Sequence, residues 1–115
     1  MNIETLREHC ISKHGVTEGF PFNETTLVFK VAGKMFCLTS LEGDFLVTMK
    51  NKPEKNIELR EQFNAVKPGY HMNKKHWNTI DINGTISDEM IFQLIDDSYN
   101  LTVQSLPKKK QQGLK

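Results

Sequence analysis

Apolar residues recur with helical spacing near both ends of the chain. Ile3, Leu6 and Cys10 fall on one stripe, which predicts a helix from residue 3 to about residue 13. A second helix is predicted from residue 87 to about residue 105, with one face formed by Ile91, Leu94, Ile95, Ser98, Thr102 and Leu106. Asn2 and Ser87 are suitable N-caps for these two helices.

Between these helices the pattern changes to the two-residue alternation of β-strands. Residues 26–50 contain three alternating runs with turns at Gly33 and Gly43, which predicts an antiparallel meander. A helix with little apolar surface is predicted over residues 54–63, and a further strand over residues 77–82. Residues 15–26 are predicted as a loop, and Pro68-Gly69 as the centre of a type II turn.

The predicted order is helix, three strands, helix, strand, helix, which is typical of α+β domains. We expect a single compact domain over residues 1–106, in which helices pack on an antiparallel sheet. A chain of 115 residues can bury a sufficient core without disulfide or metal crosslinks. Residues 107–115, PKKKQQGLK, are expected to form a basic, disordered tail.

Several features bear on where the protein resides. No stretch has the length and hydropathy of a transmembrane helix, and the first residues do not resemble a secretion signal. Cys10 and Cys37 form no C-x-x-C pair, so both are expected as reduced, buried thiols. We therefore expect a cytoplasmic monomer that does not associate with membranes.

Charge is distributed unevenly along the chain. The formal net charge is +1, but residues 107–115 carry four lysines and no acid, so residues 1–106 have a net charge of −3. Residues 50–75 hold seven basic and three acidic residues, whereas residues 76–106 hold five acidic residues and no Lys or Arg. The sequence thus predicts a basic central segment, an acidic C-terminal helix and a basic tail.

Residues 67–80, KPGYHMNKKHWNTI, hold the densest group of chemically capable side chains. His71 and His76 are five residues apart, which directs them to different sides of a helix or a strand, so we predict no metal site. No nucleophile, paired-carboxylate or phosphate-loop motif accompanies His76 as a general base. The sequence favours a non-enzymatic protein without a cofactor, and an enzyme centred on His71 or His76 is the least favoured alternative.

The same stretch interleaves cations with aromatic and amide side chains, a composition that suits nucleic acid. Lysines neutralise phosphates, aromatic rings stack on bases and amides read base edges. The predicted DNA-binding residues are Lys34 at a hairpin tip together with Lys67, Asn73, Lys74, Lys75, His76, Trp77 and Asn78. His76, Trp77 and Asn78 would either touch DNA or support the loop that does.

An alternative interpretation treats the stretch as a pocket. Tyr70, His71, His76 and Trp77 would then line a concave site for a protein partner or a small ligand. The negative charge of residues 1–106 counts against general DNA affinity, because proteins that bind DNA non-specifically usually have a basic surface, but DNA binding is the favoured interpretation. The residues alone leave both interpretations open.

The segment PGYHMNKKHWNTI also resembles the signature of the MmcQ/YjbR family of small bacterial proteins. GVTEGFPF, TLVFKVAGKMFCLTSL and ISDEMIFQLIDDSYNLTVQSLPKK match the same family in order, so the resemblance covers residues 1 to about 110. It implies an α+β fold, similar to secretion-chaperone-like and frataxin-like folds, and DNA binding through a double-wing arrangement of hairpins and loops. Most members are uncharacterised, and the family implies no catalytic residue. Its motif falls here on Gly69, Tyr70, His71, Met72, Asn73, Lys74, His76, Trp77 and Asn78.

Overall fold

The computed structural model describes residues 1–114, which form one six-stranded sheet and four helices. In chain order the elements are α1 (Ile3–Ile11), β1 (Val16–Gly19), β2 (Thr26–Val31), β3 (Lys34–Ser40), β4 (Leu46–Lys50), α2 (Pro53–Gln62), β5 (Val66–Pro68), β6 (Trp77–Asp81), α3 (Asp88–Gln104) and α4 (Lys108–Gln112). The strand order is β1-β2-β3-β4-β6-β5, and all neighbouring strands run antiparallel. The expected α+β class is confirmed. None of these helices has the length and hydropathy needed to cross a membrane.

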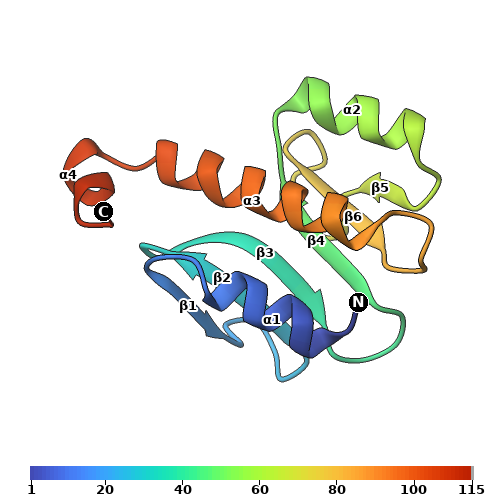
Figure 1. The fold of residues 1–115 in the computed structure, drawn as a ribbon, viewed down its shortest axis with the longest axis horizontal. Helices are drawn as coiled ribbons and strands as arrows, with labels where there is room; N and C mark the ends of the chain where they lie inside the picture. Colours follow the sequence, from blue (N-terminus) through green and yellow to red (C-terminus); the bar gives the residue numbers. More distant parts are fainter. Residues whose placement is uncertain (115) are drawn as a thin grey trace.

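Helices α1 and α3 cover one face of the sheet, and Figure 1 views the molecule from this side. The main core lies between them and the strands, where Leu6 of α1, Phe29 of β2 and Ile95 of α3 are fully buried. Helix α2 packs beside the edge strand β5 and adds Leu59 to the same core. Burying each such side chain contributes about 1.5–3 kcal/mol, so this face supplies most of the apolar stabilisation.

The other side of the sheet, which we call the open face, carries a smaller apolar cluster. Val28, Leu38, Thr48 and Thr79 lie in one row across β2, β3, β4 and β6 on this side. Val28 and Leu38 pack with Trp77 of β6, and two methionines cover the three side chains. The sheet therefore has one face buried under helices and one face covered only by loops and side chains of residues 1–114.

A β-bulge in β3 places two successive residues on the helix side of the sheet. The pairing with β2 shifts just after Phe29, and Phe36 and Cys37 are both fully buried in the main core. Ser98 of α3 donates a hydrogen bond to the Phe36 carbonyl at 2.6 Å and accepts one from the Lys50 backbone N–H at 2.8 Å. The long C-terminal helix is thus bonded directly to the two central strands.

Polar side chains join α1 to α3 at the surface. Asp96 Oδ1 lies 2.8 Å from His9 Nε2 and also pairs with the Lys13 ammonium group. The His9 ring stacks on Phe92, with 4.2 Å between the ring centroids. Burial alone would raise the pKa of Asp96, but hydrogen bonds from Lys13 and His9, together with their charges, hold it below the ordinary value. The Asp96 carboxylate of α3 therefore links the two helices through its contacts with His9 and Lys13.

Two short edge strands lie where the sequence predicts a loop or a turn. Val16–Gly19 form β1, which pairs with β2 from Val16 opposite Val31 to Gly19 opposite Val28. The predicted type II turn at Pro68-Gly69 is wrong, because Pro68 pairs with Asn78 within the sheet and Gly69 lacks the required positive φ. Strands of three or four residues are too short for alternation to distinguish them from loops.

The C-terminal segment also differs from the sequence expectation. Residues 108–112 form the short helix α4 where a disordered tail is predicted. Leu114 packs against the main core, beside Gly15 and Val31. A run of lysines provides no apolar stripe, so the pattern of the sequence does not reveal this helix.

Candidate functional site

Residues 69–76, referred to below as loop 69–76, lie on the open face and connect β5 to β6. The Gly69 backbone N–H donates to the Trp77 carbonyl at 2.7 Å, which extends the ladder between the two strands. The Tyr70 N–H donates to Thr79 Oγ1 at 3.0 Å, and Met72 packs on the open-face cluster. The main chain of the loop is thereby fixed to the sheet, while the Tyr70 side chain remains 67% exposed.

Two backbone features determine the shape of this loop. A Cβ atom at Gly69 would come within 2.6 Å of the Trp77 Cβ, so the strands approach more closely there than a side chain allows. His71 has a φ of 60°, in a turn closed by the Met72 N–H and the Gly69 carbonyl at 3.3 Å. This turn brings the Tyr70 and His71 rings to a centroid distance of 4.1 Å.

Helix α2 holds the second half of the loop in place. Arg60 Nε donates to Asn78 Oδ1 at 2.7 Å, and Arg60 Nη2 donates to the Lys74 carbonyl. Asn56 Nδ2 donates to the Lys75 carbonyl at 3.2 Å. Sequence reasoning missed this role of α2. The available signal was the four-residue spacing of Asn56 and Arg60, which places both on one side of an otherwise polar helix.

Three of the predicted DNA-contacting side chains are used by the fold itself. Trp77 is 8% exposed within the open-face cluster, and Asn78 is 2% exposed between β6 and α2. Asn73 is exposed, but its Oδ1 accepts from the backbone N–H groups of Lys75 and His76 at 2.9 and 3.3 Å. This geometry is that of an Asx turn, so Asn73 shapes the loop.

The predicted lysines fall into two groups. Lys34, Lys67 and Lys75 have exposed side chains with no hydrogen bond or ion pair to other groups within residues 1–114. Lys74 is also exposed, but its ammonium group donates to the Gly69 carbonyl at 3.0 Å and closes the loop on itself. Lys34, Lys67 and Lys75 are therefore free to bind an external anion.

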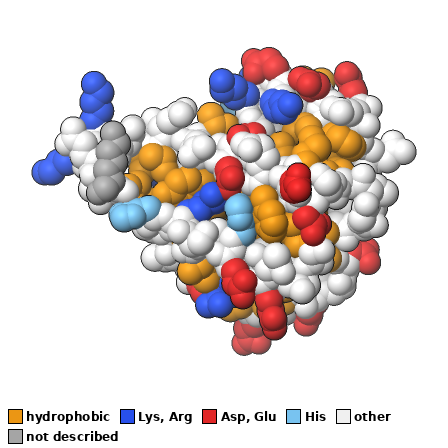
Figure 2. All heavy atoms as spheres, in the orientation of Figure 1, with side chains coloured by type: hydrophobic (Ala, Val, Ile, Leu, Met, Phe, Trp, Pro, Cys, Tyr) orange, Lys and Arg blue, Asp and Glu red, His pale blue; other side chains and the backbone are white. Residues whose placement is uncertain are grey.

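Basic residues gather at one end of the sheet, where the β2–β3 hairpin, the end of β4 and the start of β6 meet. This basic end comprises Lys30, Lys34, Lys50, Lys52, Lys74, Lys75 and the lysines of α4. The opposite end carries Glu24, Glu42, Asp44, Asp81 and Asp88. Figure 2 shows basic groups of α4 projecting at the left, acidic groups beside basic ones along the upper edge, and further acidic groups along the right and lower rim. A chain with little net charge thus presents one positive end.

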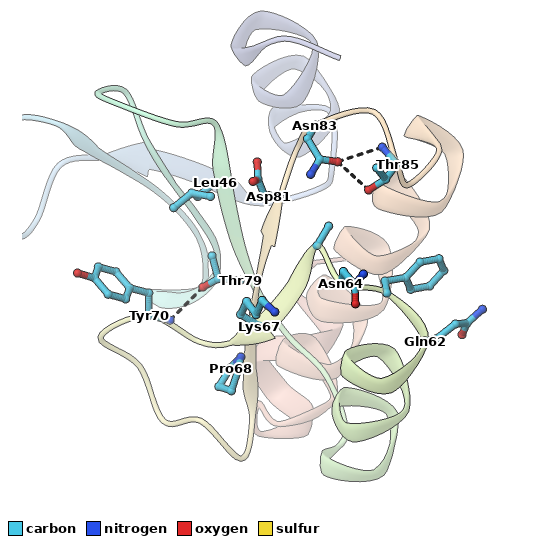
Figure 3. A pocket seen from close by; sticks show the side chains of 12 residues that line it. Leu46, Gln62, Asn64, Lys67, Pro68, Tyr70, Thr79, Asp81, Asn83 and Thr85 are labelled. Carbon is cyan, nitrogen blue, oxygen red and sulfur yellow. Dashed lines mark hydrogen bonds between the residues drawn. The ribbon is translucent and has the colours of Figure 1, made fainter.

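A cavity of about 510 Å³ opens beside loop 69–76 at the edge strand β5. In Figure 3, Lys67, Thr79 and Asp81 lie between Tyr70 on one side and Gln62 on the other. Of the four residues predicted to line a pocket, Tyr70 borders this cavity. His71, His76 and Trp77 are not among its lining residues.

The cysteines lie away from this surface. Cys10 and Cys37 are both fully buried in the main core, on α1 and β3. A hydrogen bond with Cys10 and burial raise the pKa of the Cys37 thiol, which keeps it in its weakly nucleophilic, protonated form. Within residues 1–114, no three His, Cys, Asp or Glu side chains are grouped closely enough to hold a metal ion.

These features define a small α+β domain whose sheet has one helix-covered face and one open face crossed by an anchored loop. The YjbR family model matches residues 11–101. The chain belongs to the YjbR family, which confirms the resemblance carried by its signature segment.

Relatives and solved structures agree with this assignment. YbdF of Escherichia coli O157:H7 is 39% identical over 113 residues, covering 97% of this chain and 93% of the relative. YjbR of Escherichia coli K12 is 32% identical over 115 residues, covering 99% and 98%. Both bear the description "uncharacterized protein". The crystal structure of DR2400 from Deinococcus radiodurans has a TM-score of 0.94 at 35% identity, covering 98% of this chain and 87% of that one.

Proposed function

We propose that this protein binds DNA through loop 69–76 and the basic end of the sheet. The observation that supports this function is the gathering of lysines at one end of the fold, next to the exposed rings of Tyr70 and His71. Phosphate contacts supply most of the affinity in non-specific binding, and a local positive surface is sufficient to attract the backbone.

The hairpin β2–β3 and loop 69–76 act as two wings at this end of the open face. Lys34 on the hairpin and Lys75 on the loop contact phosphates, because both ammonium groups are exposed and unpaired within residues 1–114. Lys67 of β5 extends this contact beside the loop, and Lys74 adds its positive charge while its ammonium group donates to the Gly69 carbonyl. His76, Trp77 and Asn78 support the loop, since Trp77 is buried beneath it and Asn78 accepts from Arg60 of α2, which also donates to the Lys74 carbonyl.

Salt dependence of DNA affinity tests this proposal. The affinity for duplex DNA falls as salt rises, and Lys75→Gln should make the plot of log affinity against log salt shallower by about 0.9. Lys34→Gln should have the same effect. Arg7→Gln removes an equal charge from an exposed residue of α1 that is paired with Glu18, so it should leave the slope unchanged. Fluorescence anisotropy titrations of labelled duplex and single-stranded DNA over a salt series provide the measurement.

The DNA proposal fails if neither duplex nor single strands bind at low salt. It also fails if Arg7→Gln changes the slope as much as Lys75→Gln does, because the attraction would then reflect overall charge and not the basic end.

A second candidate function, binding of a protein or a small ligand, is favoured by the cavity beside Tyr70. A small ligand seated there would raise the melting temperature of the wild type more than that of Tyr70→Ala. Thermal-shift screening checks this difference, and a specific ligand found together with absent DNA binding would replace the DNA proposal.

A further inference from the structure

The cavity beside β5 holds two charged groups of opposite sign that have no partner within residues 1–114. Lys67 lies opposite Thr79 in the β5–β6 ladder, and Asp81 is two residues beyond Thr79 on the same face of β6. The Lys67 ammonium and the Asp81 carboxylate border the cavity, yet they form neither an ion pair nor a hydrogen bond to another described group. Diagonal neighbours on a sheet are close enough for long side chains to meet. Their separation therefore leaves polar groups available to a ligand between them.

A flat aromatic ring stands at the rim of the same cavity. The Tyr70 main chain is fixed, because its N–H donates to Thr79 Oγ1, which lies 2.8 Å from Thr48 Oγ1. Its phenol ring is nonetheless exposed, and in Figure 3 it extends outward at the side of the cavity away from Gln62. An exposed ring on an anchored backbone is a suitable platform for a planar ligand group, since little freedom is lost on stacking.

The lining of the cavity combines apolar and polar side chains. Leu46, Phe63, Ala65 and Pro68 supply apolar walls, and side-chain amides at positions 62, 64 and 83 supply hydrogen-bonding groups. The volume of about 510 Å³ lies within the range of about 300–1,000 Å³ typical of ligand pockets. A planar group with hydrogen-bonding edges and an attached anion fits this combination of ring, carboxylate and ammonium.

We propose that this cavity takes up one unstacked nucleotide of a single-stranded nucleic acid, an inference that rests on the proposed DNA-binding function. The base stacks on Tyr70 and directs an N–H donor to the Asp81 carboxylate, and the adjoining phosphate binds Lys67. A base within a duplex exposes only its edges, so it cannot enter a cavity without leaving the stack. Single strands that contain cytosine or adenine should therefore bind more tightly than a duplex of comparable length.

The Asp81 carboxylate gives this site a base preference. A carboxylate accepts hydrogen bonds but cannot donate them, so it selects bases with an exocyclic amino group, such as cytosine and adenine. Thymine has a carbonyl oxygen where cytosine carries its amino group, and its single ring N–H lies between two carbonyl oxygens that repel the carboxylate, so thymine should bind less well. An amide in place of the carboxylate donates to those oxygens and should remove the discrimination.

Anisotropy titrations with oligo-dC, oligo-dA, oligo-dT and a mixed-sequence hairpin duplex test this inference. The affinity of the wild type for oligo-dC should exceed its affinity for oligo-dT by roughly fivefold or more. In D81N the two affinities should become nearly equal. D44N is the matched control, because it removes one acid from the β3–β4 turn, outside the cavity lining, and should leave the ratio unchanged. Y70L should lower the affinity for single strands by roughly fivefold or more and leave the affinity for the duplex unchanged. Y70F, which keeps the aromatic ring, should bind single strands as tightly as wild type.

The outcomes separate this inference from the proposed function. Salt-sensitive binding of all probes with equal oligo-dC and oligo-dT affinity, or an unchanged ratio in D81N, overturns the nucleotide site and leaves DNA binding intact. Equal weakening of single strands and duplex by Y70L overturns it too. Absence of binding to every probe at low salt overturns the proposed function and the nucleotide site together.

Discussion

At the scale of single residues, the loop on the open face depends on one close approach. The sequence pattern predicts that Gly69 is a turn residue with positive φ. In the structure, glycine is required there because Trp77 leaves no room for a side chain. The positive φ belongs to His71. Local propensity identified an unusual backbone position in this segment, but the cause is a contact across the ladder, which no local pattern encodes.

Gly69→Ala should therefore destabilise the protein by about 1–3 kcal/mol, the usual range for overpacking. The new Cβ would meet the Trp77 Cβ at 2.6 Å and the Trp77 carbonyl oxygen at 3.0 Å, so the strands must separate. Gly19→Ala is the control, because a Cβ there meets nothing within 4 Å. Urea unfolding measures both variants, and equal free energies of unfolding would contradict the packing argument.

At the scale of elements, the amphipathic pattern was sufficient for α1, α3 and the β2–β3–β4 meander. It was insufficient for β1 and β5, which are too short, and for the role of α2. That helix buries Asn56 at 1% exposure and uses polar groups to hold loop 69–76, so hydrophobic periodicity underestimates its importance. The candidate site could be located from its composition, but the division into supporting and exposed side chains required the fold. Trp77, for example, is buried on the open face.

Arg60→Lys tests the role of α2 as a scaffold. Lysine retains the charge but cannot donate to both Asn78 and the Lys74 carbonyl, so we expect a loss of about 1.5–3 kcal/mol in the free energy of unfolding. Arg7→Lys alters the exposed pair with Glu18 and should cost less than about 1 kcal/mol. DNA affinity of Arg60→Lys should fall without a change in salt slope, because no phosphate contact is lost.

Denaturant titration and anisotropy measure these two quantities. A destabilisation no larger than that of Arg7→Lys would show that α2 does not hold the loop. A changed salt slope would instead place Arg60 among the phosphate contacts.

At the scale of the whole molecule, charge is organised in two ways. The sheet has a basic and an acidic end, and Asp96 joins α1 to α3 on the helix side. The linear charge pattern predicted a basic middle and an acidic C-terminal helix, but it could not show that strand pairing brings Lys34 of the hairpin to the same end as Lys75. The packing of α1 against α3 also depends on contacts between residues more than eighty positions apart in the sequence. Hydrophobic periodicity describes single elements and does not predict such contacts.

Stability should depend on pH through Asp96. Its folded-state pKa is lowered, because ion pairing with Lys13 and His9 outweighs burial, whereas the unfolded value is about 3.9. The carboxylate therefore stabilises the fold above about pH 4, and this contribution is lost as pH falls through the folded-state pKa. We expect Asp96→Asn to cost about 1 kcal/mol at neutral pH and progressively less in acid.

Urea unfolding at several pH values measures this difference. Asp97→Asn is the control, because Asp97 accepts its hydrogen bond from Gln93 within the same helix. A difference between wild type and Asp96→Asn that does not shrink below pH 4 would show that the carboxylate charge is not what joins the helices.

The position of Ser98 has a consequence for how the protein folds as it is synthesised. The Ser98 hydroxyl group donates to the Phe36 carbonyl of β3 and accepts from the Lys50 N–H of β4. Ser98 nevertheless comes after every strand in the chain. Until α3 has left the ribosome, the part of the sheet that α3 covers stays exposed and the Phe36 carbonyl lacks this hydrogen-bond partner. The nascent sheet therefore remains incomplete until the last long helix has emerged and docked.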